Sequence, residues 1–315
     1  MNKVLVTGSS GFIGRELVKQ LLQFGKTVVA HSRSHVIEQC QNAHIELMPD
    51  SSWMPALDNV DTVIHCAARV HQMDETEEEA QRAYDIVNVQ ATLSLAEQAV
   101  KMGVKRFVFV SSIKVNGEWN APDVAFQHDD LPHPIDEYGK SKLSAEEQLK
   151  NLCLDSDMEL VIIRPPLVYG PGVKANFYSL LRVIDKGIPL PFGCIKTTRS
   201  LVFVKNLVDL ILVVCTHSRA PGQTFMVSDD DDVTVSGLFR AVAKHMNRPT
   251  RLIPVPQELL KLMLTLIGKK AVAQRLCLPL QVNISHTKSL LNWTPPYSFS
   301  EGLKETVDCY LEHKG

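Results

Sequence analysis

The chain has 315 residues, of which 45% are hydrophobic and 22% are charged, and its formal net charge is -2. This composition is typical of a globular protein with a sizeable core, and the small charge gives no global attraction to nucleic acid or to an anionic membrane. The first residues lead directly into a strand pattern without a signal-peptide layout, and no apolar run is long enough to cross a bilayer. The seven cysteines are scattered and odd in number. We therefore expect free thiols and a cytoplasmic location.

The first half of the chain alternates short apolar runs with amphipathic stretches. The apolar runs are rich in Val and Ile, as strands buried on both faces are, and predict strands at Val4–Thr7, Thr27–His31, Ile45–Met48, Thr62–His65, Phe107–Ser111 and Leu160–Arg164. The stretches between several of them predict helices at Phe12–Phe24, Ala80–Met102 and Tyr138–Leu154. Strands that alternate with helices predict an α/β fold, a doubly wound parallel sheet of the Rossmann type.

After residue 169 the pattern changes to shorter elements punctuated by Gly and Pro. Helices are predicted at Asn176–Lys186, Gly237–Met246, Gln257–Ile267 and Ser300–Leu311. The segment 200–215 is apolar enough to return to the large core. We therefore expect a dinucleotide-binding domain at 1–169, which 200–228 rejoins, and a smaller interleaved substrate-binding lobe at 170–315.

A glycine-rich turn connects the first predicted strand to the first predicted helix. In the sequence Gly8-Ser-Ser-Gly11-Phe-Ile-Gly14, Gly8 permits a tight turn, Gly11 lets the backbone approach a pyrophosphate, and Gly14 lets helix and strand pack closely. The free N–H groups at the start of the helix then face the anion. The turn residues expected to contact a dinucleotide are Gly8, Ser10, Gly11, Phe12, Ile13 and Gly14.

The end of the second predicted strand bears on which dinucleotide is bound. Sites for NAD usually place an acidic side chain here, but this chain has Ser32 followed by Arg33. An arginine without a neighbouring carboxylate can hold a 2′-phosphate, so we predict a preference for NADP, with NAD possible. The alternative is a surface arginine beside a site for NAD. Asp50 is predicted to bond the adenine amine or to cap a helix.

Tyr138 and Lys142 open a predicted helix with a spacing that places both on one face. A lysine ammonium beside a tyrosine, with an oxidised nicotinamide nearby, stabilises the phenolate and makes it a useful acid–base group at neutral pH. Ser111 and Ser112 end the preceding strand at the sheet edge that faces the ligand crevice. We therefore predict a catalytic set of Ser112, Tyr138 and Lys142.

The motifs together resemble those of a known family. They are T-G-x-x-G-F-I-G, "HCAA" (65–68), Asn88 in "VNVQAT", "VSSIKVNG" (110–117), Y-x-x-x-K and "RPPLVYGPG" (164–172). The chain resembles, over essentially its whole length, the extended short-chain dehydrogenase/reductases of the sugar-nucleotide epimerase/dehydratase family. It looks most similar to bacterial UDP-hexose 4-epimerases and UDP-4-keto-hexosamine reductases of polysaccharide biosynthesis.

The resemblance implies roles for further residues. Ala67 and Ala68 border the cofactor ribose, Asn88 steadies the active-site backbone, and no metal is needed. The UDP contacts of the family match Asn176, Phe192, Arg199 and, more loosely, Arg275. The family also implies a homodimer in which the helices Ala80–Met102 and Tyr138–Leu154 pair with those of a second copy.

Two departures from the family pattern narrow the activity. Ile113 and Lys114 stand where 4,6-dehydratases carry an Asp-Glu pair, so a dehydratase is not expected. Leu167 stands where many epimerases have an asparagine. We favour a 4-ketoreductase acting on a UDP-linked hexose or N-acetylhexosamine, because Ser32 and Arg33 suit NADPH. A 4-epimerase that retains NAD is the alternative, and a non-catalytic dinucleotide sensor is a remote one.

Overall fold

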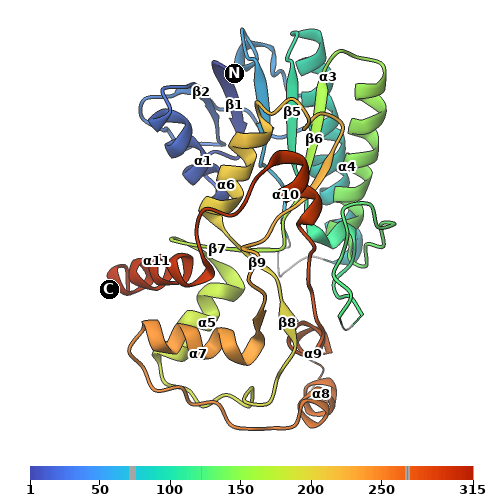
Figure 1. Cartoon of the computed structure of the whole chain (residues 1–315). Helices are drawn as coiled ribbons and strands as arrows, with labels where there is room; N and C mark the ends of the chain where they lie inside the picture. The colour runs from blue at the N-terminus through green and yellow to red at the C-terminus, as the bar shows by residue number, and fades with distance from the viewer. Residues whose placement is uncertain (71–75, 122, 267, 269, 315) are drawn as a thin grey trace.

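The computed structural model describes residues 1–70, 76–121, 123–266, 268 and 270–314. Its main sheet has seven parallel strands (Figure 1). In spatial order the strands are β10 (Thr224–Met226), β6 (Glu159–Arg164), β5 (Arg106–Val110), β4 (Thr62–His65), β1 (Lys3–Thr7), β2 (Thr27–His31) and β3 (Gln41–Ala43). All neighbouring pairs are parallel. This order confirms the predicted doubly wound sheet, and its topological switch point lies between β1 and β4.

Helices cover both faces of this sheet. They are α1 (Phe12–Gln23) and α6 (Val204–Val214) on one face, and α3 (Ala91–Lys101) and α4 (Glu137–Leu154) on the other. Leu17 of α1 and Leu207 of α6 are fully buried in the first apolar layer. Leu95 of α3 and Leu149 of α4 are fully buried in the second. Because both faces are covered, the strands can be largely apolar, and the Val and Ile runs correctly predicted β1, β2, β4, β5 and β6, but not the two edge strands β3 and β10.

One predicted strand is wrong. The structure has β3 at Gln41–Ala43, whereas residues 45–48 are not in a strand. Ile45 and Leu47 nevertheless pack against the second apolar layer, and the Ile45 carbonyl contacts the buried His31 ring, with Nε2 and O 2.8 Å apart. Ile45 and Leu47 are therefore partly buried because this loop lies against the core, and not because the segment is a strand.

The predicted helix Ala80–Met102 is interrupted. It consists of α2 (Glu77–Tyr84), a π-helical turn at Asp85–Gln90, and α3. α2 begins with a capping box in which the Thr76 hydroxyl accepts from the Glu79 N–H. A π-helical turn inserts an extra residue into the helix and often marks a functional site.

The second half contains small elements and returns to the sheet. Its remaining helices are α5 (Ala175–Asp185), α7 (Val235–His245), α8 (Gln257–Leu266), α9 (Lys270–Cys277), α10 (Ser285–Leu291) and α11 (Phe299–Glu312), and its short strands are β7 (Leu167–Tyr169), β8 (Thr198–Arg199), β9 (Leu201–Phe203) and β11 (Val233–Thr234). β10 pairs with β6, α10 packs on β10, and α6 packs on α1. These contacts agree with an interleaved arrangement, while the domain boundaries stay a prediction. Within the described ranges, no helix is both long and apolar enough to cross a membrane.

Candidate active site

The glycine turn between β1 and α1 is as tight as its spacing predicts. Gly8 has φ +67°, a conformation that favours glycine, and a Cβ there would lie 2.9 Å from the Ala67 backbone. A Cβ on Gly14 would lie only 2.2 Å from the Gly8 carbonyl oxygen. Any larger residue at Gly14 would therefore push α1 away from the turn.

The N-terminus of α1 is suited to a diphosphate. Gly11 is the N-cap residue of α1, and no side chain in the described part of the chain caps it. The first N–H groups of a helix have no partner inside the helix, so those of Phe12, Ile13 and Gly14 are available to an anion. Ser10 is half-buried beside them. These residues fit the pyrophosphate of a dinucleotide, and the half-buried Ala67 and Ala68 follow β4 at the same edge.

The end of β2 is organised by His31, which the sequence analysis did not single out. His31 is buried, its Nδ1 lies 3.3 Å from the Gly8 N–H nitrogen, and its ring packs edge-on against Trp53 at 4.7 Å between centroids. Burial lowers the pKa of His31, which favours the neutral form of the ring. The buried Ser32 hydroxyl donates to the His35 carbonyl at 2.5 Å, whereas Arg33 is exposed.

Asp50 lies in an exposed turn after β3. It is not a helix cap, because the N-cap of the next helical turn is Trp53. Its predicted contact with adenine stays untested.

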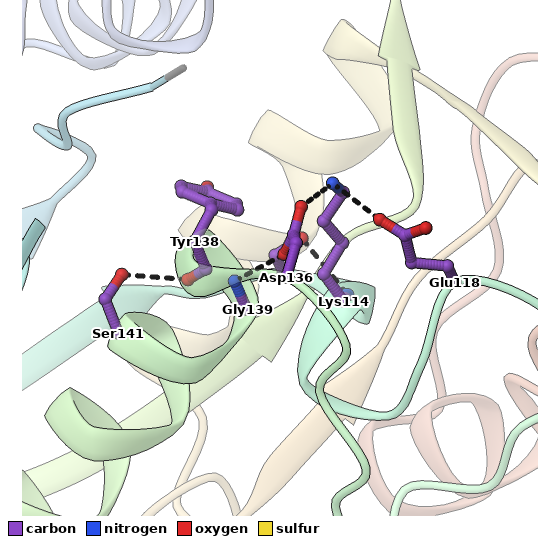
Figure 2. Close-up of polar contacts among 7 residues, drawn as sticks. Lys114, Glu118, Asp136, Tyr138, Gly139 and Ser141 are labelled. Atoms are coloured by element: carbon purple, nitrogen blue, oxygen red, sulfur yellow. Dashed lines mark hydrogen bonds and ion pairs between the residues drawn. The ribbon is translucent and has the colours of Figure 1, made fainter. Parts of the chain in front are cut away.

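Tyr138 and Ser112 are brought together by the packing of two turns. Ser112 follows β5 and begins a 3₁₀ turn at Ile113–Val115, where its Oγ accepts from the Lys114 N–H at 3.2 Å. Tyr138 lies in the first turn of α4, directly before Gly139. A Cβ on Gly139 would lie 2.7 Å from the Lys114 carbonyl oxygen, so the two turns are in direct contact (Figure 2). The half-buried Ser112 and Tyr138 side chains therefore lie at the same end of the sheet.

Lys142 lies one turn further along α4, with only 2% of its surface exposed. Its Nζ donates to the Val110 carbonyl at 3.0 Å and lies 4.5 Å from the centroid of the Phe109 ring. Burial lowers the pKa of Lys142 to about 8. Among the described contacts its ammonium is held by the backbone of β5 and not by the Tyr138 hydroxyl, which differs from the simple pairing that the spacing suggested.

The proton affinity of Tyr138 is set by several neighbours. Burial raises the pKa of Tyr138, and the nearby Asp136 and Tyr84 raise it further. The Tyr84 ring packs edge-on against the Tyr138 ring, with 6.0 Å between the centroids. A positive charge near the phenol is therefore needed before Tyr138 can work as a base at neutral pH.

A buried ion pair fixes α4 against the sheet. Glu146 of α4 and Arg164 at the end of β6 are 2.5 Å apart and almost completely buried. The Ser111 hydroxyl donates to Glu146 at 2.5 Å, and Arg164 also donates to the Asn116 side chain at 2.9 Å. The Ser111 hydroxyl is therefore engaged inside the protein, which leaves Ser112 as the hydroxyl at the predicted site.

Asn88 lies in the π-helical turn and connects the loop after β4 to α4. Its side chain accepts from the Arg69 N–H at 2.8 Å and donates to the Ser141 hydroxyl at 3.0 Å. The Ser141 hydroxyl in turn donates to the Tyr138 carbonyl at 2.8 Å (Figure 2). This chain of hydrogen bonds reaches the backbone of Tyr138.

The residues predicted to hold UDP are spread over the second half of the chain. Asn176 is exposed in the first turn of α5. Phe192 packs in a T-shaped arrangement with Phe239 of α7, with 5.3 Å between the ring centroids, so part of its ring surface is already in contact with the protein. Arg199 of β8 donates to the Leu278 carbonyl at 3.1 Å. Arg275 belongs to α9, but its side chain lies outside the described part of the structure.

Comparison with known proteins decides the family. The model of the NAD dependent epimerase/dehydratase family matches residues 4–228. The chain belongs to this family. The predictions that it is an enzyme and a member of the epimerase/dehydratase family are thereby confirmed.

Individual relatives cover the whole length of the chain. A UDP-glucose 4-epimerase of Vibrio cholerae is 46% identical over 313 residues, which cover 98% of this chain and 95% of the relative. An N-acetyl-alpha-D-glucosaminyl-diphospho-ditrans,octacis-undecaprenol 4-epimerase of Escherichia coli is 29% identical, with 99% and 96% of the two chains covered. Among solved structures, MoeE5 in complex with UDP-glucose and NAD covers 100% of both chains at 25% identity and a TM-score of 0.80.

Proposed function

We propose that the protein is a 4-epimerase of a UDP-linked hexose or N-acetylhexosamine and that it holds NAD. The observation that carries this proposal is the packing of the Tyr138 turn on the Ser112 turn, at the sheet edge to which the glycine turn also belongs. The full-length similarity to the UDP-glucose 4-epimerase of Vibrio cholerae supports the reaction. This choice replaces the 4-ketoreductase that we favoured from the sequence.

The chain's own residues provide the proton chemistry. The nicotinamide, when bound, would accept a hydride from C4 of the sugar and return it to the other face. Tyr138 would take the proton from the C4 hydroxyl in the first half of the reaction and give it back in the second. The Ser112 hydroxyl would hydrogen-bond the same sugar oxygen. The buried Lys142 would hold the cofactor and supply positive charge at the bottom of the site.

NAD is the better supported cofactor. The NADP preference that we predicted rested on Ser32 and Arg33, and the relatives give it no support. In the structure the Ser32 hydroxyl is used by the His35 carbonyl and Arg33 is an exposed side chain, which fits the alternative of a surface arginine beside a site for NAD. The structure of MoeE5, which contains NAD, favours the same assignment.

A 4-ketoreductase is the second candidate, and one observation favours it. Leu167 begins β7 with 45% of its surface exposed, at the position where many epimerases present an asparagine to the sugar. An apolar side chain there cannot make the hydrogen bond that the asparagine makes to the sugar. That loss matters more for an epimerase, which must bind its sugar in two orientations, than for a reductase.

The test is direct. Purified protein is incubated with UDP-glucose, UDP-N-acetylglucosamine or the undecaprenol-linked N-acetylglucosaminyl diphosphate, without added cofactor, and the C4 epimer is followed by nuclear magnetic resonance. Epimer should form with at least one substrate, and Tyr138→Phe should lose roughly 10²–10⁴-fold in rate because it removes only the transferable proton. Oxidation of NADPH by a UDP-4-keto sugar, with no epimer from any substrate, would establish the reductase instead. A Tyr138→Phe variant with activity near that of the wild type would refute the role of Tyr138 in proton transfer, in the epimerase and in the reductase alike.

A further inference from the structure

Lys114 forms a charge cluster beside the candidate active site. Its ammonium pairs with the Asp136 carboxylate and lies 3.1 Å from the Glu118 carboxylate (Figure 2). All three side chains are partly buried, with 32%, 35% and 23% of Lys114, Asp136 and Glu118 exposed. Surface ion pairs contribute little, but a lysine held by two carboxylates in a partly buried place has a defined position.

The cluster is joined to Tyr138 in two ways. The Lys114 Nζ lies 6.0 Å from the centroid of the Tyr138 ring. Asp136, the partner of Lys114, is also the N-cap of α4, where its other carboxylate oxygen accepts from the Gly139 N–H at 2.8 Å. Lys114 therefore contacts the residue that starts the helix carrying Tyr138.

We propose that Lys114 is a positioning residue for proton transfer by Tyr138: its ammonium neutralises Asp136 and fixes the N-terminus of α4 against the end of β5. The proposal rests on the proposed function only in assigning proton transfer to Tyr138. It gives Lys114 a role that differs from that of the acid found at this place in dehydratases.

The charges around Tyr138 explain why such a residue is needed. The titratable groups on the described elements that pack against it are Asp136, Glu137 and Lys140 at the start of α4, Lys142 one turn on, Lys114 in the 3₁₀ turn, Glu118 after that turn, Tyr84 of α2, and the mutually paired Glu146 and Arg164. Asp136 raises the pKa of Tyr138. An ammonium bound to that carboxylate opposes the effect, whereas removing the ammonium leaves the negative charge uncompensated beside the phenol.

The experiment measures the pH dependence of kcat/KM in the NAD-containing protein. Lys114→Met should move the limb assigned to Tyr138 to higher pH by on the order of 1 unit. Lys114→Arg keeps the charge and should leave the limb near its original place. Asp136→Asn keeps a good N-cap residue and should move the limb to lower pH. In an epimerase this is the acid limb and in a reductase the basic limb, but the direction of each shift is the same.

The matched control is Lys140→Met, which removes an exposed lysine of the same helix from its ion pair with Glu137 at 2.7 Å. It should leave the limb in place. The phenolate absorbance of wild-type protein minus that of Tyr138→Phe gives the same titration without turnover. Inactive wild-type protein would therefore refute the proposed function alone. An unshifted titration in Lys114→Met or Asp136→Asn, or an equal shift in Lys140→Met, would refute the role of Lys114.

Discussion

Replacing Lys142 by methionine should stabilise the fold while abolishing activity. The lysine is almost fully buried, and its pKa is lowered to about 8, mainly by burial. A lysine in the unfolded chain titrates near 10.4, so keeping the charge inside the protein at pH 7 costs about 3 kcal/mol. Methionine has a similar length and no charge. It loses the hydrogen bond to the Val110 carbonyl, worth about 1 kcal/mol, which leaves a net gain of about 2 kcal/mol.

The assay is urea unfolding of protein freed of dinucleotide, at a series of pH values. Between about pH 8 and 10 the unfolded chain binds more protons at this lysine than the folded protein does, so wild-type stability should rise with pH. That rise should be missing in Lys142→Met, and the stability advantage of the variant should disappear by about pH 10. Lys140→Met, a change at an exposed lysine of the same helix, is the control and should change stability by less than about 0.5 kcal/mol. A variant less stable than wild type at pH 7, or a constant difference over this range, would show that the reasoning is wrong.

Three further predictions use other parts of the structure. In urea unfolding, Arg164→Met should lower the free energy of unfolding by about 3–5 kcal/mol, because it leaves Glu146 buried without its partner. The double variant Arg164→Met/Glu146→Met should recover most of that loss. As a control, Lys304→Met at the exposed Lys304–Asp308 pair should lower it by less than about 0.5 kcal/mol. Arg33→Ala should leave NAD affinity unchanged in calorimetry, and a selective loss of NADPH affinity would restore the NADP assignment. Light scattering should report a homodimer of about twice 35.1 kDa, since an isologous contact across the outer sides of α3 and α4 would bury more than about 1,000 Å²; a 35.1 kDa particle would rule it out.

The sheet and the dinucleotide turn were predictable because they depend on local rules. Thr27–His31 and Thr62–His65 match β2 and β4 residue for residue, since a strand covered on both faces has a short run of apolar residues at its centre. The same criterion failed at Ile45–Met48, where a loop buries alternate side chains without pairing. Gly8 and Gly14 were assigned from their spacing together with their position between the first strand and the first helix, and the close approach of the Gly8 and Ala67 backbones gives the physical reason.

The chemistry around Tyr138 was only partly predictable. The tyrosine, lysine and serine follow from a short motif, but the partners that tune them come from distant parts of the chain. Lys114 and Asp136 are 22 residues apart and meet only because two turns pack together. His31 shows the same limit, because a histidine that ends a strand gives no sign of its contacts with Gly8 and Trp53. For Asp136 the sequence offered one signal: an aspartate just before a predicted helix is a good N-cap residue.

The return of the chain to the sheet affects how the molecule can be synthesised. β10 covers the open edge of β6, but it is made about 60 residues later, after α5 and α6. Until residue 214 leaves the ribosome, α1 lacks the apolar surface of α6, and until residue 226 leaves it, one edge of β6 presents unpaired backbone groups. A nascent chain that stalls before α6 would expose both surfaces at once, so the sheet formed by the first half of the chain cannot be completed until part of the second half has been made.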